Sequence, residues 1–152
     1  MIADGDFTRT NPNSKAVWYF QQHDVNGDGK FEIEEKMSRS LSTISIQNDL
    51  LFVSDVEGIL HCLDRTTGKQ YWGFDMFAAT YTTPLIVGDE VYLGDEDGDL
   101  CVFGCSADPG VAIPNGEPLR CIEMGASLYG SVVSDNGKLI IATKNELIVM
   151  DE

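Results

Sequence analysis

The sequence is short of basic residues, with 10 Lys and Arg against 25 Asp and Glu and a formal net charge of −15 at pH 7. Proteins that bind nucleic acids or anionic membranes use clusters of Lys and Arg to neutralise phosphate groups. The shortage therefore argues against binding to nucleic acid. It favours cations or basic protein surfaces as partners.

The sequence also lacks a long apolar run. A membrane-spanning helix needs about 20 consecutive apolar residues, and no segment of the chain approaches that length. Residues Met1–Asp6 contain neither the basic nor the apolar part of a signal peptide, so we expect no membrane span and no signal peptide in this chain. The composition is 43% hydrophobic and 9% aromatic over 152 residues, which predicts a folded core rather than a disordered acidic tail.

Cysteine and histidine are too few and too scattered for a zinc site. The chain has two histidines, and none of its four cysteines forms a Cys-Xaa-Xaa-Cys pair. Cys62 and Cys101 fall in β-prone runs and are expected to be buried thiols, with a disulfide between Cys101 and Cys121 as the alternative. The redox states of Cys101, Cys105 and Cys121 stay open at this point.

A repeat of about 40 residues organises the chain. The segment Leu51–Leu60 matches Val91–Leu100 at an offset of 40 residues, and Leu139–Met150 is a third, slightly shorter copy. Each copy has an apolar run, a polar turn and a second apolar run. Four short β-prone runs in a unit of this length are typical of β-propeller blades, whereas a β-sandwich would not repeat its turns so closely.

The repeat predicts an all-β fold, a partial β-propeller of four-stranded antiparallel blades. Its blades are expected at 42–74 and 82–123, with an incomplete last blade at 130–152. The second blade carries extra residues at Ala107–Asn115, a stretch rich in Pro and Gly that is predicted to be a loop.

The first blade contains a family signature. Leu63–Trp72 reads LDRTTGKQYW and resembles the L-D-x-x-T-G-K-x-x-W signature of pyrroloquinoline-quinone (PQQ)-like β-propeller repeats. The resemblance extends over roughly 15–152, and it implies that Trp72 docks between neighbouring blades. In the second blade Arg120 and Cys121 stand where aromatic residues are expected, which departs from the pattern.

The resemblance also implies that the chain forms part of a larger propeller. Lys15–Phe20 resembles Lys69–Phe74, so residues 1–20 are predicted to end a preceding blade with a strand at about 15–20. The chain would then hold two full blades and parts of two others, fewer than a closed propeller needs. We expect its partners to be other blades of a parent protein, or further copies that associate through open blade edges. Proteins of this family are often periplasmic or exported, but the residues of this chain do not fix its compartment.

The first acidic cluster fits a calcium-binding loop of the EF-hand type. Residues 24–35 place oxygen-bearing groups at the ligating positions, and Gly29 occupies the sixth position, where the chain turns sharply. We expect a structural Ca²⁺ here in preference to Mg²⁺, which demands a tighter octahedral site. The six expected ligands are Asp24, Asn26, Asp28, the backbone carbonyl of Lys30, Glu32 and Glu35.

The loop interrupts the repeat, and residues 21–41 are predicted to be an insertion between two blades. On its entering side the β-prone residues Val17–Phe20 favour a strand, and the helix of a complete EF-hand is the alternative. On its exit side Ile33, Met37 and Leu41 recur at helical spacing and predict a short helix.

The second acidic cluster, Gly94–Asp99, has a different explanation. Its Asp-Gly dipeptide is typical of a hairpin turn, and it lacks the ligand spacing of a calcium loop. A turn is therefore predicted, with a second site for a cation or a basic partner as the alternative.

Two functional classes fit these features. The first is a non-catalytic, calcium-binding propeller segment that serves as a binding or scaffold module. The alternative is a fragment of a PQQ-dependent quinoprotein dehydrogenase, for which the resemblance implies a quinone over the propeller axis and a disulfide between adjacent cysteines. No two cysteines are adjacent in this sequence, so we expect no bound PQQ and favour a chain that is not an enzyme.

Overall fold

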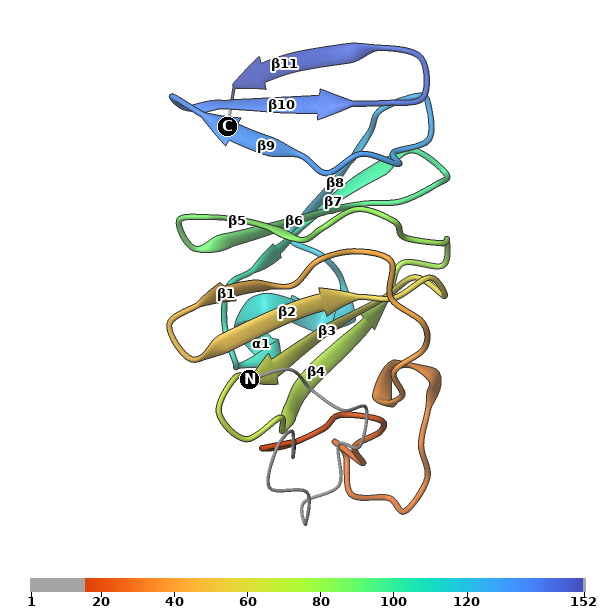
Figure 1. Ribbon diagram of the computed structural model, residues 1–152, viewed down its shortest axis with the longest axis vertical. Helices are drawn as coiled ribbons and strands as arrows, with labels where there is room; N and C mark the ends of the chain where they lie inside the picture. The colour runs from red at the N-terminus through yellow and green to blue at the C-terminus, as the bar shows by residue number, and fades with distance from the viewer. Residues whose placement is uncertain (1–15, 152) are drawn as a thin grey trace.

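Three antiparallel β-sheets stack along the longest axis of the molecule (Figure 1). The structure is a computed structural model that describes residues 16–151. The first sheet contains, in chain order, β1 Ser45–Gln47, β2 Leu50–Ser54, β3 Ile59–Asp64 and β4 Gln70–Asp75. The second contains β5 Leu85–Val87, β6 Glu90–Gly94, β7 Asp99–Gly104 and β8 Arg120–Glu123. The third contains β9 Val133–Asp135, β10 Lys138–Ala142 and β11 Leu147–Asp151.

These sheets confirm the predicted partial propeller, with two four-stranded blades and a third of three strands. The first strands of the sheets lie next to one another. The hydroxyl oxygens of Thr43 and Thr83, which precede β1 and β5, are 2.9 Å apart, and the amide of Thr83 donates to Ser131 Oγ ahead of β9. The first strands therefore lie nearest to the propeller axis, and the fourth strands form the outer rim.

The repeated turns between the second and third strands depend on glycine. Gly58 and Gly98 have φ angles of 95° and 101°, which favour glycine. A Cβ atom at Gly58 would lie 2.2 Å from the backbone oxygen of Ala78, and one at Gly98 would lie 3.0 Å from that of Ala126. The second acidic cluster accordingly forms the predicted hairpin turn between β6 and β7.

Apolar side chains fill the spaces between the sheets. Phe52, Trp72 and Phe103 belong to the cluster between the first and second sheets. Leu100 and Ile141 belong to the cluster between the second and third. The middle strands are buried on both faces, which explains why their sequences are continuous apolar runs rather than alternating ones.

The entering side of the acidic loop differs from both expectations. Residue 15 lies outside the described residues, and residues 16–20 form neither the predicted strand nor the helix of an EF-hand. Trp18 and Phe20 instead lie on the open face of the first sheet, beside Leu51, Val53 and Leu63. Packing of these aromatic rings on the sheet face holds the segment in place, and the segment does not pair with a strand.

The exit side is also not the predicted helix. One 3₁₀ turn, η1 at Ile33–Glu35, is followed by extended backbone at Lys36. The amide of Met37 donates to Gln21 O, and the amide of Ser38 donates to Asp55 Oδ2. These bonds use the donors that would have continued the helix, and they tie the segment to the first sheet instead.

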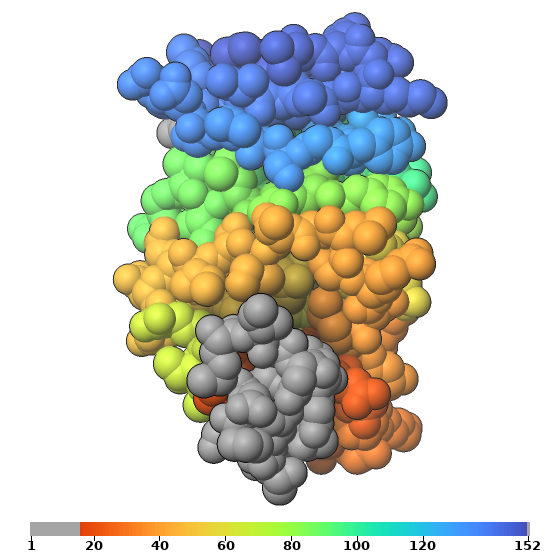
Figure 2. Space-filling view, in the orientation of Figure 1, coloured from red at the N-terminus to blue at the C-terminus, as the bar shows by residue number. Residues whose placement is uncertain are grey.

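The loop between β7 and β8 contains a short helix, α1 at Pro109–Ala112, and a 3₁₀ turn, η2 at Pro114–Gly116. Figure 2 shows the sheets as successive layers, with the third sheet at one end and residues 21–41 towards the other. Over residues 16–151 the structure has no helix that is long and apolar enough to cross a membrane.

Candidate functional site

The acidic loop 24–35 is shaped by its own carboxylates. Gly27 and Gly29 have φ angles of 76° and 81°, in the left-handed region that favours glycine. The Oδ1 atom of Asp24 accepts a hydrogen bond of 2.6 Å from the amide of Gly27, and its Oδ2 accepts one of 2.9 Å from that of Gly29. Asp28 Oδ1 accepts from the amide of Lys30 at 2.8 Å. The loop is therefore organised around oxygens that the sequence predicted to be calcium ligands.

Glu35 closes the loop from its far end. Its side chain is 6% exposed, and its two oxygens accept hydrogen bonds from the amides of Val25 at 2.7 Å and Glu32 at 3.3 Å. Burial opposes ionisation of Glu35, but these donors outweigh it and hold the pKa below its ordinary value. The hydrogen bond to the Glu35 side chain raises the pKa of Glu32.

Four of the predicted ligands, Asp24, Asn26, Asp28 and Glu35, thus turn side-chain oxygens onto backbone amides of the loop. Within residues 16–151, no group of three or more His, Cys, Asp and Glu side chains is arranged to hold a metal ion. The loop backbone agrees with the motif, whereas calcium binding stays a prediction. The residues concerned are Asp24, Asn26, Asp28, Lys30, Glu32 and Glu35.

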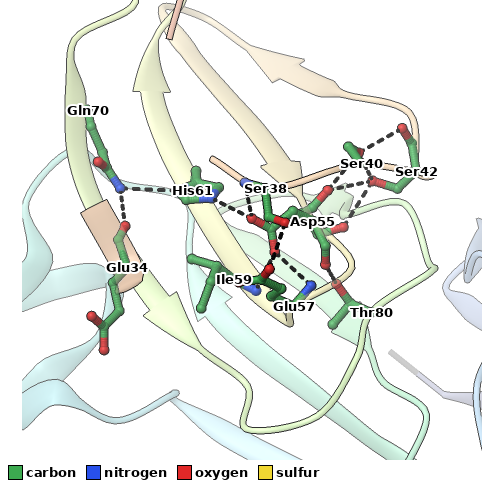
Figure 3. Close-up of polar contacts among 11 residues, drawn as sticks. Glu34, Ser38, Ser40, Ser42, Asp55, Glu57, Ile59, His61, Gln70 and Thr80 are labelled. Carbon is green, nitrogen blue, oxygen red and sulfur yellow. Dashed lines mark hydrogen bonds and ion pairs between the residues drawn. The ribbon is translucent and has the colours of Figure 1, made fainter. Parts of the chain in front are cut away.

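The end of the loop is docked onto strand β4. Gln70 Nε2 donates a hydrogen bond of 2.6 Å to the backbone carbonyl oxygen of Glu34 (Figure 3). Gly73 allows the close approach, because a Cβ atom at that position would lie only 2.2 Å from the same oxygen. A residue with no side chain on β4 is therefore needed for η1 to lie against the strand.

A buried polar network continues from this contact into the first sheet (Figure 3). Gln70 Nε2 lies 3.2 Å from His61 Nδ1, and His61 Nε2 lies 3.3 Å from Asp55 Oδ2. Asp55 also accepts a bond of 2.9 Å from the amide of Ser38. We assign an imidazole proton to Nε2, because Gln70 then donates to Nδ1 and Asp55 accepts from Nε2. The network connects the two ends of the segment 34–38 through the sheet.

Sequence reasoning missed most of this network. Gln70 occupies one of the variable positions of the repeat signature, so the motif gave no indication of its role. His61 stands out as a polar residue in an apolar strand, but its partners come from elsewhere in the chain. One signal was available, because Asp55 and Asp95 recur at the same place in the repeat and both are fully buried.

The opposite face of β4 holds the loop between β7 and β8. Trp72 Nε1 donates a hydrogen bond of 2.8 Å to the backbone oxygen of Ser106, and the indole lies near Phe52 and Phe103. Trp72 therefore docks between the two blades, as its resemblance to the family signature implied. In the second blade Cys121 forms a disulfide with Cys101 on the neighbouring strand.

A cavity of about 420 Å³ lies along β4, between the acidic loop and the loop that contains α1. Its walls include aromatic and aliphatic side chains as well as carboxylates. The acidic loop and η1 contribute Val25, Asn26, Glu32, Glu34 and Glu35. Strand β4 and the residues after it contribute Tyr71, Trp72, Gly73, Phe74, Asp75 and Phe77. The loop between β7 and β8 contributes Pro109, Ile113, Gly116 and Glu117.

Comparison with known proteins identifies relatives of this chain. A family profile described as outer membrane protein assembly factor BamB matches residues 3–112. The curated BamB of Shewanella oneidensis is 31% identical over 78 residues, which are 51% of this chain and 20% of that protein. The matched part of the chain thus spans about a fifth of its curated relative.

Solved structures share the fold. The crystal structure of BamB from Moraxella catarrhalis superposes with a TM-score of 0.62 at 19% identity, over 76% of this chain and 35% of that one. A quinohemoprotein alcohol dehydrogenase from Pseudomonas putida HK5 has a TM-score of 0.56 at 17% identity, over 67% and 16% of the two chains. The enzyme of the same name from Comamonas testosteroni has a TM-score of 0.54 at 19% identity, over 66% and 16%. At these identities the likeness concerns the fold alone.

Proposed function

The chain belongs to the BamB family of PQQ-like repeat proteins, and from this premise we propose that it is a non-catalytic binding or scaffold module that carries a structural Ca²⁺ in the loop 24–35. One contact carries the proposal. The loop with calcium-ligand spacing is joined to the outer strand of a blade by the hydrogen bond from Gln70 to the backbone oxygen of Glu34. An ion bound there would stiffen the connection between two blades.

The chemistry of the loop supports calcium. The donors are hard oxygens from carboxylates, an amide and a backbone carbonyl, which Ca²⁺ prefers at six to eight positions. Ca²⁺ would replace the backbone amides as the partner of several of these oxygens and would offset the repulsion among the carboxylates. The ligands would be Asp24, Asn26, Asp28, Lys30 through its carbonyl, Glu32 and Glu35.

A binding role agrees with the family. The curated relative is named as an assembly factor for outer membrane proteins, so its described role concerns other proteins rather than a chemical reaction. We therefore propose that this segment contacts protein partners, in addition to the other blades of a parent propeller or further copies of the chain.

The quinoprotein dehydrogenase alternative draws on the fold likeness to two alcohol dehydrogenases. The feature that separates the two functions is the disulfide, since Cys101 pairs with Cys121 across two strands rather than with an adjacent cysteine. Addition of PQQ followed by absorption spectroscopy and a dye-linked alcohol oxidation assay tests the alternative. A bound chromophore with turnover would contradict the non-catalytic proposal.

The same disulfide supports an oxidising compartment, because disulfides persist in periplasmic and secreted proteins and are rare in the cytosol. We propose an exported location for the parent protein on this ground.

Isothermal titration calorimetry with Ca²⁺ tests the metal proposal. The wild-type chain should bind one ion, and Asp24→Ala and Glu35→Gln should each weaken binding by at least about tenfold, since each removes a charged ligand. Asp97→Ala, in the exposed part of the second acidic cluster, is the matched control and should leave binding unchanged. Equal affinity in all four proteins would show that the loop is not the site.

A further inference from the structure

The two insertions in the repeat meet at the same strand. The segment 21–41 precedes the first blade, and the loop 105–119 connects β7 to β8, where the first blade needs only residues 65–69. Neither insertion is required to form a blade. Their convergence on the two faces of β4 is therefore a feature of this chain beyond the repeat itself.

Each insertion is anchored to β4 by a side chain that donates to its backbone. Gln70 Nε2 donates to the backbone oxygen of Glu34 at 2.6 Å, and Trp72 Nε1 donates to that of Ser106 at 2.8 Å. Residues two apart on a regular strand point to the same face, but the β3–β4 register shifts between Cys62 and Leu63. Because of this irregularity, the side chains of Gln70 and Trp72 lie on opposite faces of the sheet. One insertion therefore lies on each side of the strand.

The cavity between the insertions runs along an open strand edge. Five consecutive residues of β4, from Tyr71 to Asp75, line it. The amide of Met76 donates to Gly58 O, so the alternation of an antiparallel ladder directs the backbone groups of Trp72 and Phe74 towards β3. The backbone groups of Gly73 and Asp75 then point to the outer edge, with which no segment in residues 16–151 pairs.

This edge belongs to the outer rim of the propeller. Neighbouring blades stack on the faces of the sheets, as the second sheet does on the first. Further blades of a parent protein would extend the stack in the same way and would leave the outer edge of β4 uncovered. Within residues 16–151, no segment fills the groove, and closure of the propeller would not cover it.

The walls of the groove are acidic and aromatic. Glu34, Asp75 and Glu117 line it together with three of the expected calcium ligands, and no Lys or Arg is among the lining residues. Phe77, at its rim, is 86% exposed and has a φ angle of 60°, an unfavourable conformation for an aromatic residue. The Phe77 amide donates to Asp75 Oδ1 at 2.7 Å, which holds this conformation. Negative charge and an exposed ring together complement a basic, partly apolar partner.

We propose that this groove binds an extended basic segment of a partner protein, which adds as a fifth strand to the outer edge of β4. Main-chain hydrogen bonds to Gly73 and Asp75 would supply the pairing. Lysine or arginine side chains of the segment would meet the carboxylates on both walls, and its apolar side chains would meet the aromatic and aliphatic lining residues. The inference rests on the proposed protein-binding role of the segment, and it does not require that the loop binds calcium.

The probe is a fluorescein-labelled peptide of alternating lysine and valine, capped at both ends. Its binding to the full chain is followed by fluorescence anisotropy, once in Ca²⁺ and once in EDTA. We expect saturable binding that weakens as the salt concentration rises. Two further peptides separate charge from strand pairing. One has glutamate in place of lysine, and the other has proline in place of every second valine, which keeps the charge but removes main-chain donors.

Charge reversal on the protein locates the site. Glu34→Lys and Glu117→Lys should each lower the affinity for the lysine–valine peptide by about tenfold. The matched control is Glu123→Lys, at an exposed position on β8, which should have little effect on the affinity. Equal binding of the proline peptide, or equal affinity in all three variants, would overturn the inference. Binding of the peptide without binding of Ca²⁺ would support the groove while contradicting the metal site.

A second copy of the chain is the competing occupant of the groove. Analytical ultracentrifugation of the same proteins detects such self-association. If the wild type forms dimers that Glu117→Lys dissociates, the groove holds a second copy of the chain and the basic-segment inference is wrong. If the oligomeric state is the same in wild type and variant while peptide affinity falls, the inference is supported.

Discussion

The side-chain amide of Gln70 donates to two acceptors at once, the backbone oxygen of Glu34 at 2.6 Å and the buried His61 Nδ1 at 3.2 Å. Gln70 itself is only 1% exposed. One side chain thereby joins the insertion that carries the acidic loop to the polar interior of the first blade. The docking of the loop and the stability of the blade should consequently change together.

Gln70→Ala should destabilise the protein by about 1–3 kcal/mol, because it leaves the buried His61 Nδ1 and the partly buried oxygen of Glu34 without this donor. Gln47→Ala is the matched control. Gln47 Nε2 also donates to a backbone oxygen, that of Gly88 at 2.9 Å, but the bond is exposed, and its loss should cost less than about 0.5 kcal/mol. Urea unfolding followed by circular dichroism gives both values. Equal losses in the two variants would show that the buried position of Gln70 has no special role.

Gly73→Ala tests the contact between η1 and β4. The added methyl group would lie 2.2 Å from Glu34 O, so the turn or the strand must move, at a cost of about 1–3 kcal/mol. At Gly130 the same substitution meets Ala142 Cβ at 3.5 Å and Ala142 O at 3.8 Å, which are ordinary contacts, and should be nearly neutral. Thermal unfolding of the two variants measures the difference. A Gly73→Ala protein as stable as Gly130→Ala would contradict the tight packing of the loop on the strand.

Asp55 and Asp95 occupy the same buried position in successive repeats but differ in their surroundings. Burial alone would raise the pKa of Asp55, but hydrogen bonds from His61 and from backbone amides hold that pKa below its ordinary value. Cys101 stands in the second blade where His61 stands in the first. Burial therefore dominates there and raises the pKa of Asp95 despite its own amide donors.

Opposite pH effects should follow. The stabilisation from Asp55 is present above its unfolded pKa and is lost as the pH falls through its folded pKa. Asp55→Asn should therefore destabilise the protein at pH 7, by about 1–3 kcal/mol, and by less in acid. The stabilisation from Asp95 is present below its unfolded pKa and is lost as the pH rises through its raised folded pKa.

Asp95→Asn should accordingly stabilise the protein at pH 7, by about 1 kcal/mol, and leave it unchanged in acid. Urea unfolding of both variants from pH 3 to 8 checks the two signs. The same sign for both substitutions at pH 7 would contradict the role assigned to His61.

The blades could be predicted from the sequence because their determinants are local and repeated. Apolar runs and glycine-containing turns recur between the first and second blades at an offset of 40 residues, and they set the strands and their pairing. The backbone of the loop 24–35 was predictable for a related reason. Gly29 and the spaced carboxylates act within a few residues of one another.

The segments on either side of the loop could not be predicted in the same way, because partners distant in sequence decide their structure. Val17–Phe20 is β-prone, but Trp18 and Phe20 pack on the open face of the first sheet, and no strand forms. The helical spacing of Ile33, Met37 and Leu41 is overridden when the amide of Ser38 bonds to Asp55. The groove along β4 likewise depends on two insertions that only the folded chain brings together.

Removal of calcium should lower stability through mass action if the ion binds only the folded loop. At a free Ca²⁺ concentration one hundred times the Kd, the stabilisation would be about 2.7 kcal/mol, and excess EDTA would abolish it. Asp24→Ala should eliminate the difference between the two conditions, whereas Asp97→Ala should retain it. Differential scanning calorimetry in Ca²⁺ and in EDTA makes the comparison. A melting temperature that is the same in both conditions for the wild type would contradict a folding-linked ion.

The disulfide between Cys101 and Cys121 should contribute to stability by closing the loop between β7 and β8. A bridge across 20 residues restricts the unfolded chain by about 3 kcal/mol in the chain-entropy treatment, so Cys121→Ser should lower the free energy of unfolding by up to that amount. Cys105→Ser, which removes a partly buried free thiol, is the control and should cost less than about 1 kcal/mol.

Alkylation followed by mass spectrometry identifies the same bond. The denatured but unreduced protein should react at Cys62 and Cys105 alone, and reduction should expose all four thiols. In the native protein, burial raises the pKa of the Cys62 thiol, so Cys62 should react more slowly than Cys105. Modification of all four cysteines before reduction would contradict the disulfide, and with it the support for an oxidising compartment.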